Sequence, residues 1–259
     1  MSMTTQAQPT TNQEQTVSER VSHLRHQTLQ RITASAVQLG RERLYPDRRS
    51  CEYLFLTERR KLFSEWLQKL PERPLRVLDV GGRIQPYRPL LKGREGSYLA
   101  VDPQVTGLVN AVAVGENLPL KDESVDLVLC TGMLCYAKDP VRVIAEIRRV
   151  LIPGGTLLLG VPAIHPYHAE NDRWRFFPDG LRILLSGFSH VEIRPEGHSL
   201  SSFCSILTIW LDLFTEKWAL RKAVKEVLIP TLNRIGEHCD HWSGGNIALT
   251  TSFSALARK

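Results

Sequence analysis

The sequence lacks several features that would place the protein in a membrane or outside the cell. It has no run of 18 apolar residues, so it predicts no membrane-spanning helix. Its polar N-terminus has no apolar stretch typical of a signal peptide. The five cysteines are odd in number and form no CxxC pair, which argues against a disulfide framework or a zinc site. We therefore expect a cytoplasmic protein.

What the chain does contain suits a folded α/β domain. It has 259 residues, 42% of them hydrophobic, enough for one large domain with a full core. The net charge is +6 and the isoelectric point is about 9.2. Because the positive excess is spread along the chain, a nucleic-acid partner is disfavoured, although the charge permits one.

The chain divides into three parts. Residues 1–16 are polar and lack aromatics, which predicts a disordered tail. Residues 17–74 form a helical segment, with helices expected over 17–44 and 52–70, that covers the sheet or gates the site. Residues 75–259 form the main domain.

In that domain short apolar runs alternate with helical patterns. A helix is expected over 140–151, with Asp139 as its cap and Pro140 in its first turn. The alternation predicts a parallel sheet with helices on both faces. The expected strands are 75–80, 97–101, 125–130, 155–161, 189–194 and 246–257.

Residues 201–230 interrupt this rhythm as a helical insert. An apolar stretch that includes Trp210 is followed by Lys217, Arg221, Lys222 and Lys225. Two interpretations stay open. The insert forms a lid or packs on the core, or residues 201–228 make an interfacial helix that touches a membrane or a lipid-linked substrate.

Two acids carry the strongest functional signal. Asp79 lies one residue before the end of one predicted strand and is followed, after Val80, by Gly81 and Gly82, and Asp102 ends the next strand. The glycines let the backbone bend sharply and approach a ligand, and the following helix presents its amino end there. Asp79 suits a ligand with an ammonium group, and Asp102 suits a pair of ribose hydroxyls. A dinucleotide site would show GxGxxG, which is absent here.

Four segments together resemble the class I S-adenosylmethionine-dependent methyltransferases, in particular their small-molecule branch. They are Val77-Leu78-Asp79-Val80-Gly81-Gly82, Val101-Asp102, the pair Glu116–Leu120 and Ser124–Leu129, and Arg148–Gly155. The resemblance covers about residues 75–195 and the last strand. It implies a Rossmann-like, seven-stranded mixed sheet with helices on both faces and an antiparallel last strand.

The resemblance also implies a cofactor, S-adenosyl-L-methionine, and roles for single residues. Asp79 and the backbone of Gly81 and Gly82 hold the methionine end, and Asp102 holds the ribose. Glu116 and Asn117 lie near the adenine, and Cys130 and Thr131 lie near the sulfonium. The chain departs from the family where Arg83 replaces a usual glycine, Gln85 replaces a later one, and Cys135-Tyr136 replaces a usual Glu-His pair.

Residues 162–177 follow the expected strand 155–161 and carry the candidates for acceptor chemistry. His165 or His168 can serve as a general base, with Asp172 or Glu170 orienting it. Arg175 either binds an acidic group of the substrate or pairs with Asp172. Tyr136 is a further candidate for substrate contact. No metal site is expected, because the spacing matches no metal signature.

The sequence therefore predicts an enzyme that methylates a small-molecule acceptor. The favoured acceptor is a hydroxyl of a sugar, glycan precursor or secondary metabolite, because residues 162–177 are similar to a segment in methyltransferases of glycan biosynthesis clusters. The acceptor can be lipid-linked, with peripheral membrane contact. The alternatives are an RNA methyltransferase and a non-catalytic partner protein with the same fold.

Overall fold

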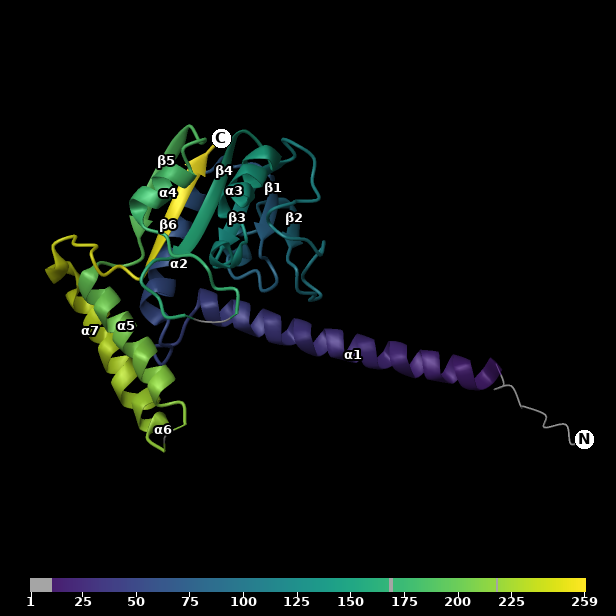
Figure 1. The fold of residues 1–259 in the computed structure, drawn as a ribbon, viewed down its shortest axis with the longest axis horizontal. Helices are drawn as coiled ribbons and strands as arrows, with labels where there is room; N and C mark the ends of the chain where they lie inside the picture. Colours follow the sequence, from purple (N-terminus) through teal and green to yellow (C-terminus); the bar gives the residue numbers. More distant parts are fainter. Residues whose placement is uncertain (1–10, 168–169, 218) are drawn as a thin grey trace, which may run out of the picture.

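The computed structural model describes residues 11–167, 170–217 and 219–259 (Figure 1). In these residues one mixed sheet has six strands in the order β2-β1-β3-β4-β6-β5. The strands β1 to β4 run parallel, and β6 runs antiparallel to both β4 and β5. The predicted Rossmann-like mixed sheet with an antiparallel last strand is confirmed. The bounds are β1 Leu75–Val80, β2 Glu95–Val101, β3 Val125–Thr131, β4 Leu151–Pro162, β5 His190–Pro195 and β6 Ser252–Arg258.

The expected seventh strand is wrong. Beside the edge strand β2, the described chain makes a single parallel bridge between Ala111 and Val101. The next residues on that side, Val112 and Val114, are exposed, so they gain little from extending the pairing. The Asn110 side chain also accepts the Ala100 backbone N–H at 2.8 Å, and thereby replaces a ladder bond.

Helices cover both faces of the sheet, as predicted. Helices α3 (Pro140–Val150) and α4 (Pro178–Leu184) pack on one face, and α2 (Tyr53–Gln68) packs on the other. The Asp139 side chain accepts the Arg142 N–H at 3.0 Å and caps α3, which confirms that helix start. Short 3₁₀ turns are η1 (Arg88–Leu91), η2 (Leu134–Tyr136) and η4 (Asp240–Ser243).

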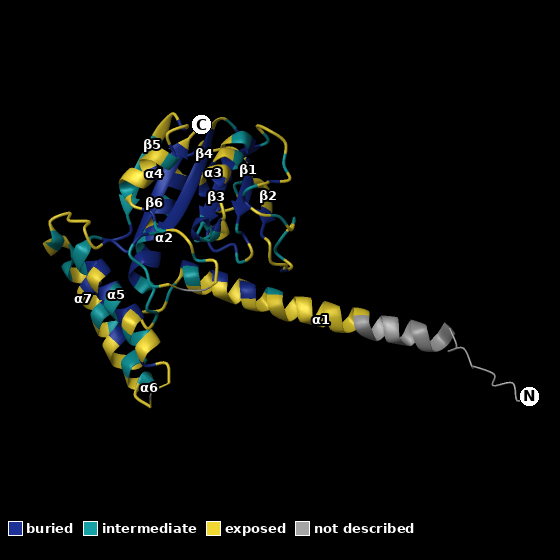
Figure 2. Ribbon diagram, in the orientation of Figure 1, coloured by how far each residue is buried: buried dark blue, intermediate teal, exposed yellow. Residues whose placement is uncertain are grey.

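Two arms leave the body of the protein (Figures 1 and 2). Helix α1 (Thr11–Leu44) begins before Val17, inside the segment predicted as a tail. The predicted insert is a helical hairpin of α5 (Ser199–Phe214) and α7 (Ile229–Cys239), joined by α6 (Arg221–Ala223) and a π-helical turn, η3 (Val224–Leu228). Among the described residues, no helix is long and apolar enough to cross a membrane.

Candidate functional site

The turn after β1 is built around Gly81. Its φ is +81°, a conformation that favours glycine, and its N–H donates to the Val101 carbonyl at 2.8 Å. A Cβ on Gly81 would lie 2.7 Å from the Cβ of Met133, so no side chain fits there. The turn is thereby fixed between the end of β2 and the segment after β3.

The two predicted acids adjoin this turn. Asp79 lies in β1, in register with Ala100 of β2, and Asp102 follows the end of β2 directly. Both side chains are buried, Asp79 to 3% exposure and Asp102 to 6%. Asp102 accepts the Gln104 N–H at 2.7 Å. The sheet therefore brings the two acids to one edge, as the strand-end pattern predicts.

Arg83, which departs from the family pattern, does not fill this turn. Its side chain is exposed and donates to the Gln104 side chain at 2.6 Å. Gln85, at the later glycine position, holds a φ of +45°, and its side-chain amide donates to the Leu108 carbonyl at 2.7 Å. The two substitutions thus leave the turn at Gly81 in place.

Burial raises the pKa values of both acids and so favours their protonated forms. Burial is the main cause that raises the pKa of Asp79 from 3.8 to about 7, and the charge of Asp102 adds to it. The Tyr98 hydroxyl donates to Asp79 at 2.6 Å and opposes the rise. Burial also raises the pKa of Asp102, against the Gln104 N–H and the charge of Arg83. Sequence reasoning missed Tyr98, although strand alternation places it on the face of Ala100.

The other predicted cofactor residues surround this edge. Cys130 is buried at the end of β3, and burial followed by the charge of Asp79 raises its thiol pKa. Thr131 is half-exposed as the last residue of β3. The Glu116 carboxylate accepts the Lys138 N–H at 2.8 Å and ties two loops together, while the Asn117 N–H donates to the Val114 carbonyl. Their contacts to adenine and sulfonium remain predictions.

These residues fit S-adenosylmethionine. The turn at Gly81 is a cradle that a Cβ would fill, and it leaves the backbone open to close approach by a ligand. Asp79 and Asp102 supply carboxylate oxygens for an ammonium and for hydroxyl donors. Among the described residues, neither acid forms an ion pair within the chain.

Helix α1 covers the loops at this edge. The Thr33 hydroxyl accepts the Gly107 N–H at 2.7 Å, beyond β2. Gly40 packs so closely on the loop after β1 that its Cβ would lie 2.1 Å from the Ile84 carbonyl oxygen. The second half of α1 therefore lies over the segments that follow both acids.

The segment after β4 places His165 near α2. The half-buried His165 ring meets the Phe55 ring edge-on, with 6.1 Å between centroids. Its Nδ1 lies 3.2 Å from the Pro166 carbonyl oxygen, which can only accept. In this contact Nδ1 is the donor. The second candidate base, His168, lies outside the described residues.

Asp172 and Arg175 are joined to each other. The guanidinium donates to both carboxylate oxygens, at 2.5 and 2.8 Å, so the predicted pairing with Asp172 is present, and contact of Arg175 with a substrate acid stays a prediction. Arg175 also donates to the His165 carbonyl at 3.1 Å and to the Pro166 carbonyl at 2.9 Å. The pair thus shapes the loop that carries His165. Burial, followed by the charges of Cys135 and Asp172, raises the pKa of nearby Tyr136.

A buried ion pair that the sequence reasoning missed lies behind this loop. Arg59 of α2 donates to both carboxylate oxygens of Glu196 at 2.6 and 2.8 Å, and Ser254 of β6 donates to the same carboxylate at 2.6 Å. Both charged side chains are almost completely buried. Arg59 stands four residues before Phe63, a residue expected on the inward face of α2, so helical spacing was the available signal.

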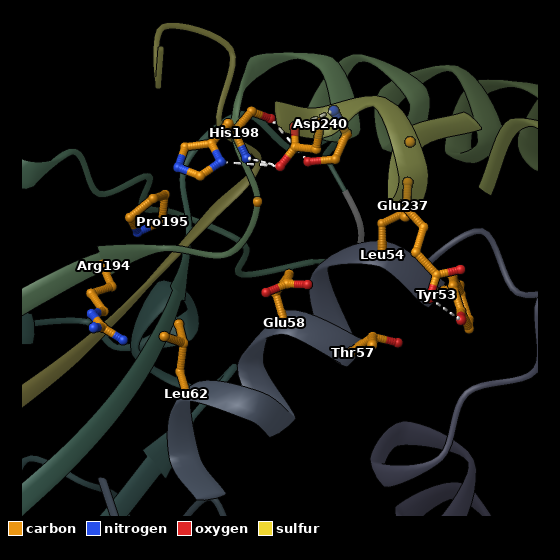
Figure 3. A pocket seen from close by; sticks show the side chains of 13 residues that line it. Tyr53, Leu54, Thr57, Glu58, Leu62, Arg194, Pro195, His198, Glu237 and Asp240 are labelled. Carbon is orange, nitrogen blue, oxygen red and sulfur yellow. Dashed lines mark hydrogen bonds and ion pairs between the residues drawn. The ribbon is translucent and has the colours of Figure 1, made fainter. Parts of the chain in front are cut away.

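A separate cavity of about 320 Å³ lies between α2, the end of β5 and the α5–α7 hairpin (Figure 3). None of the predicted site residues lines it. Its His198–Asp240 pair, 3.1 Å apart, also has a structural explanation, because Asp240 accepts the backbone N–H groups of His198 and Ser201 at the start of α5. In the described part of the chain, no cluster of side chains suits a metal ion.

Comparison with known proteins bears on this site. Residues 77–159 match the family described as a methyltransferase domain. The human thiol S-methyltransferase TMT1B is 42% identical over 65 residues, 25% of this chain and 27% of that protein. An uncharacterized methyltransferase of Mycobacterium tuberculosis is 36% identical over 103 residues, 36% of this chain and 41% of that protein. The matches thus span less than half of these relatives.

The whole chain is also similar in fold to a solved structure. It is the Burkholderia thailandensis 1,6-didemethyltoxoflavin-N1-methyltransferase with bound 1,6-didemethyltoxoflavin and S-adenosylhomocysteine. The TM-score is 0.50 at 17% identity, over 98% of this chain and 93% of that one. These findings confirm the predicted resemblance to class I S-adenosylmethionine-dependent methyltransferases and support the predicted cofactor. Similarity to enzymes of glycan clusters stays a prediction.

Proposed function

We propose that this protein transfers the methyl group of S-adenosyl-L-methionine to a small-molecule acceptor. One observation carries the proposal: Asp79, the Gly81 turn and Asp102 meet at one sheet edge, buried and without an ion pair among the described residues. Asp102 binds the ribose hydroxyls, and Asp79 and the turn bind the methionine end. The methyltransferase-domain match over residues 77–159 and the fold likeness support this assignment.

In this reaction the protein needs only to position the acceptor and to remove its proton. The sulfonium supplies a methyl group already activated for in-line displacement. The chain orients the acceptor and excludes water. For a hydroxyl acceptor, the oxygen–carbon bond forms as the carbon–sulfur bond breaks, and the proton passes to Nε2 of His165. The contact between Nδ1 and the Pro166 carbonyl orients the ring.

The favoured acceptor is a hydroxyl of a sugar, glycan precursor or secondary metabolite. The relatives named as thiol S-methyltransferases favour a second candidate, a small thiol. The two differ in their need for a base. A thiol ionises near pH 8.5, so at mildly alkaline pH it supplies its own thiolate, whereas a hydroxyl does not.

Methyl transfer from labelled S-adenosylmethionine to panels of hydroxyl and thiol compounds tests the proposal. His165→Ala should lower turnover of a hydroxyl acceptor by about 10²- to 10⁴-fold, the usual contribution of a general base. His190→Ala, on the exposed side of β5, is the matched control and should leave turnover unchanged. A loss below tenfold in His165→Ala excludes the base role with hydroxyl acceptors.

Two outcomes would overturn the proposed function. The first is transfer to RNA but to neither panel, with binding that weakens steeply as salt is raised, which assigns the enzyme to nucleic acid. The second is the absence of S-adenosylmethionine binding in titration calorimetry, which assigns the fold to a non-catalytic partner. Saturable binding with transfer to either panel sustains the proposal.

A further inference from the structure

Helix α5 has the opposite polarity to an ordinary surface helix. The side chains that it buries are mostly small and polar, whereas those that it exposes are large and apolar. A helix that packs on a globular core normally buries its apolar stripe. The buried residues are Ser201, Ser202, Cys204, Ser205, Thr208 and Ile209, and the exposed ones are Phe203, Trp210, Leu213 and Phe214.

The exposed residues form one continuous surface, which we call the aromatic stripe (Phe203, Trp210, Leu213 and Phe214). Positions 203, 210 and 214 are spaced by seven and four residues, so they share a helix face. The Trp210 and Phe214 rings stack, with centroids 4.8 Å apart and an interplanar angle of 11°. Each of the four side chains is about half exposed. Contiguous apolar surface of this kind marks an interaction site.

The tip of the hairpin adds apolar and cationic side chains. Leu220 at the start of α6, and Val227 and Leu228 in η3, are exposed. Residues 216–226 contain four cations and two acids, Glu216 and Glu226, and Glu226 pairs with Arg49 at 2.9 Å. Asp212 pairs with two of the cations, Arg221 at 3.5 Å and Lys225 at 3.1 Å. The other two cations, at positions 217 and 222, are exposed, so the tip presents positive charge beside apolar surface.

We propose that the α5–α7 hairpin docks on an anionic phospholipid surface. The aromatic stripe and the apolar tip enter the interface between headgroups and acyl chains, where tryptophan and phenylalanine are favoured, and the tip cations contact the headgroup phosphates. The tip projects away from the sheet, so a flat surface can reach it without meeting the body (Figure 1).

Charge distinguishes lipid from a second copy of the chain as the occupant. A symmetric pairing through the hairpin would bring two cationic tips toward each other, which costs free energy, whereas anionic headgroups attract them. The hairpin also begins at Ser199, shortly after β5 ends at Pro195. Because β4 and β5 run in the same direction, docking turns the carboxyl edge of the sheet toward the lipid surface.

Co-sedimentation of the full chain with vesicles tests the proposal. The vesicles are phosphatidylcholine alone, or phosphatidylcholine with phosphatidylserine, matched in size. The protein should bind only the anionic vesicles. The double variant K217E/K222E should lower the partition coefficient by at least about tenfold, since each basic residue near a membrane contributes about fivefold. The double variant W210A/F214A should lower it by at least as much.

The matched control is V141A/I183A, which removes two equally exposed apolar side chains from α3 and α4. It should bind as the unaltered chain does. Thermal unfolding confirms that each variant is folded before it is compared. Equal binding to both kinds of vesicle, no binding to either, or undiminished binding of the hairpin variants overturns the proposal. A dimer in sedimentation equilibrium that W210A/F214A dissociates also overturns it, in favour of a second copy.

Discussion

The same sheet carries two buried acids whose partners differ. Glu196, just after β5, receives two hydrogen bonds from Arg59 and one from Ser254. Asp79, in β1, receives the Tyr98 hydroxyl and lies close enough to Asp102 for their charges to repel. Among the described residues, an ion pair satisfies the first acid and none satisfies the second.

This difference separates a structural site from a binding site. A buried charge is costly unless a partner offsets its desolvation. At Glu196 the chain supplies that partner, and the pair joins α2 to the β5–β6 side of the sheet. At Asp79 the chain supplies only a hydroxyl, and in the function we propose the ammonium of the ligand completes the site. Four predictions test this distinction.

The largest effect is expected at the Arg59–Glu196 ion pair. Arg59→Met leaves Glu196 charged and buried, and should lower the free energy of unfolding by about 3–5 kcal/mol. The double variant R59M/E196L should recover part of this loss, because it removes both charges. Denaturant unfolding measures each value. Asp79→Asn should cause no such loss, and a loss in Arg59→Met below about 1 kcal/mol would contradict the structural role.

The contrast also shows what sequence could predict. Asp79, Gly81 and Asp102 were found because short apolar runs ending in acids report the carboxyl ends of parallel strands, which meet at one edge. The Arg59–Glu196 pair joins residues 137 positions apart, and only tertiary packing brings them together. Helical spacing within α2 could have placed Arg59 inward, yet it could not have identified the partner.

The strand count failed for a similar reason. The sequence showed six strand-like runs, and the resemblance added a seventh. The residues around Ala111 would form a strand only if they paired with β2 along their length. The residues that follow Ala111 are exposed, so burial does not favour this pairing. In the acceptor loop, the sequence proposed Asp172 both as orienter of a histidine and as partner of Arg175. The structure shows the pairing with Arg175, whose bidentate geometry spacing alone does not define, and the orienting role stays a prediction.

The second prediction concerns Asp102, one of the two buried acids that have no ion pair among the described residues. Asp102→Ala should weaken S-adenosylmethionine binding about 100-fold, because a hydrogen bond to a charged group is worth about 1.5–3 kcal/mol and the ribose offers two hydroxyls. Titration calorimetry gives the dissociation constants. Asp179→Ala, which removes a fully exposed acid at the start of α4, is the control and should bind normally. A change below about threefold in Asp102→Ala would remove the ribose assignment.

The third prediction follows from the raised pKa of Asp79, about 7. Only the ionised carboxylate attracts the ammonium, so affinity should fall by up to about tenfold per pH unit below 7 and level off above it. The folded state holds this proton more tightly than the unfolded chain does. The contribution of Asp79 to the free energy of unfolding is therefore greatest below its ordinary pKa of 3.8 and is lost as pH rises through 7.

Calorimetric titrations between pH 6 and 8 measure this dependence, and denaturant unfolding at the same values measures stability. Asp79→Asn should flatten both curves, since it removes the titrating group without changing its size. A wild-type affinity that stays level from pH 6 to 8 would mean that Asp79 is already ionised, and that the chain compensates its charge as it does at Glu196.

The smallest effect is expected for Tyr98→Phe. It removes the 2.6 Å hydrogen bond to Asp79, at a cost of about 0.5–1.5 kcal/mol in the free energy of unfolding. Because that bond opposes the rise in the pKa of Asp79, its loss should move the midpoint of the affinity curve to higher pH. Tyr45→Phe, at an exposed tyrosine, should leave the midpoint unchanged. An unmoved midpoint in Tyr98→Phe would show that Tyr98 only packs against Asp79. A midpoint shifted to higher pH would show that the Tyr98 hydroxyl is the group that allows Asp79 to ionise near neutral pH.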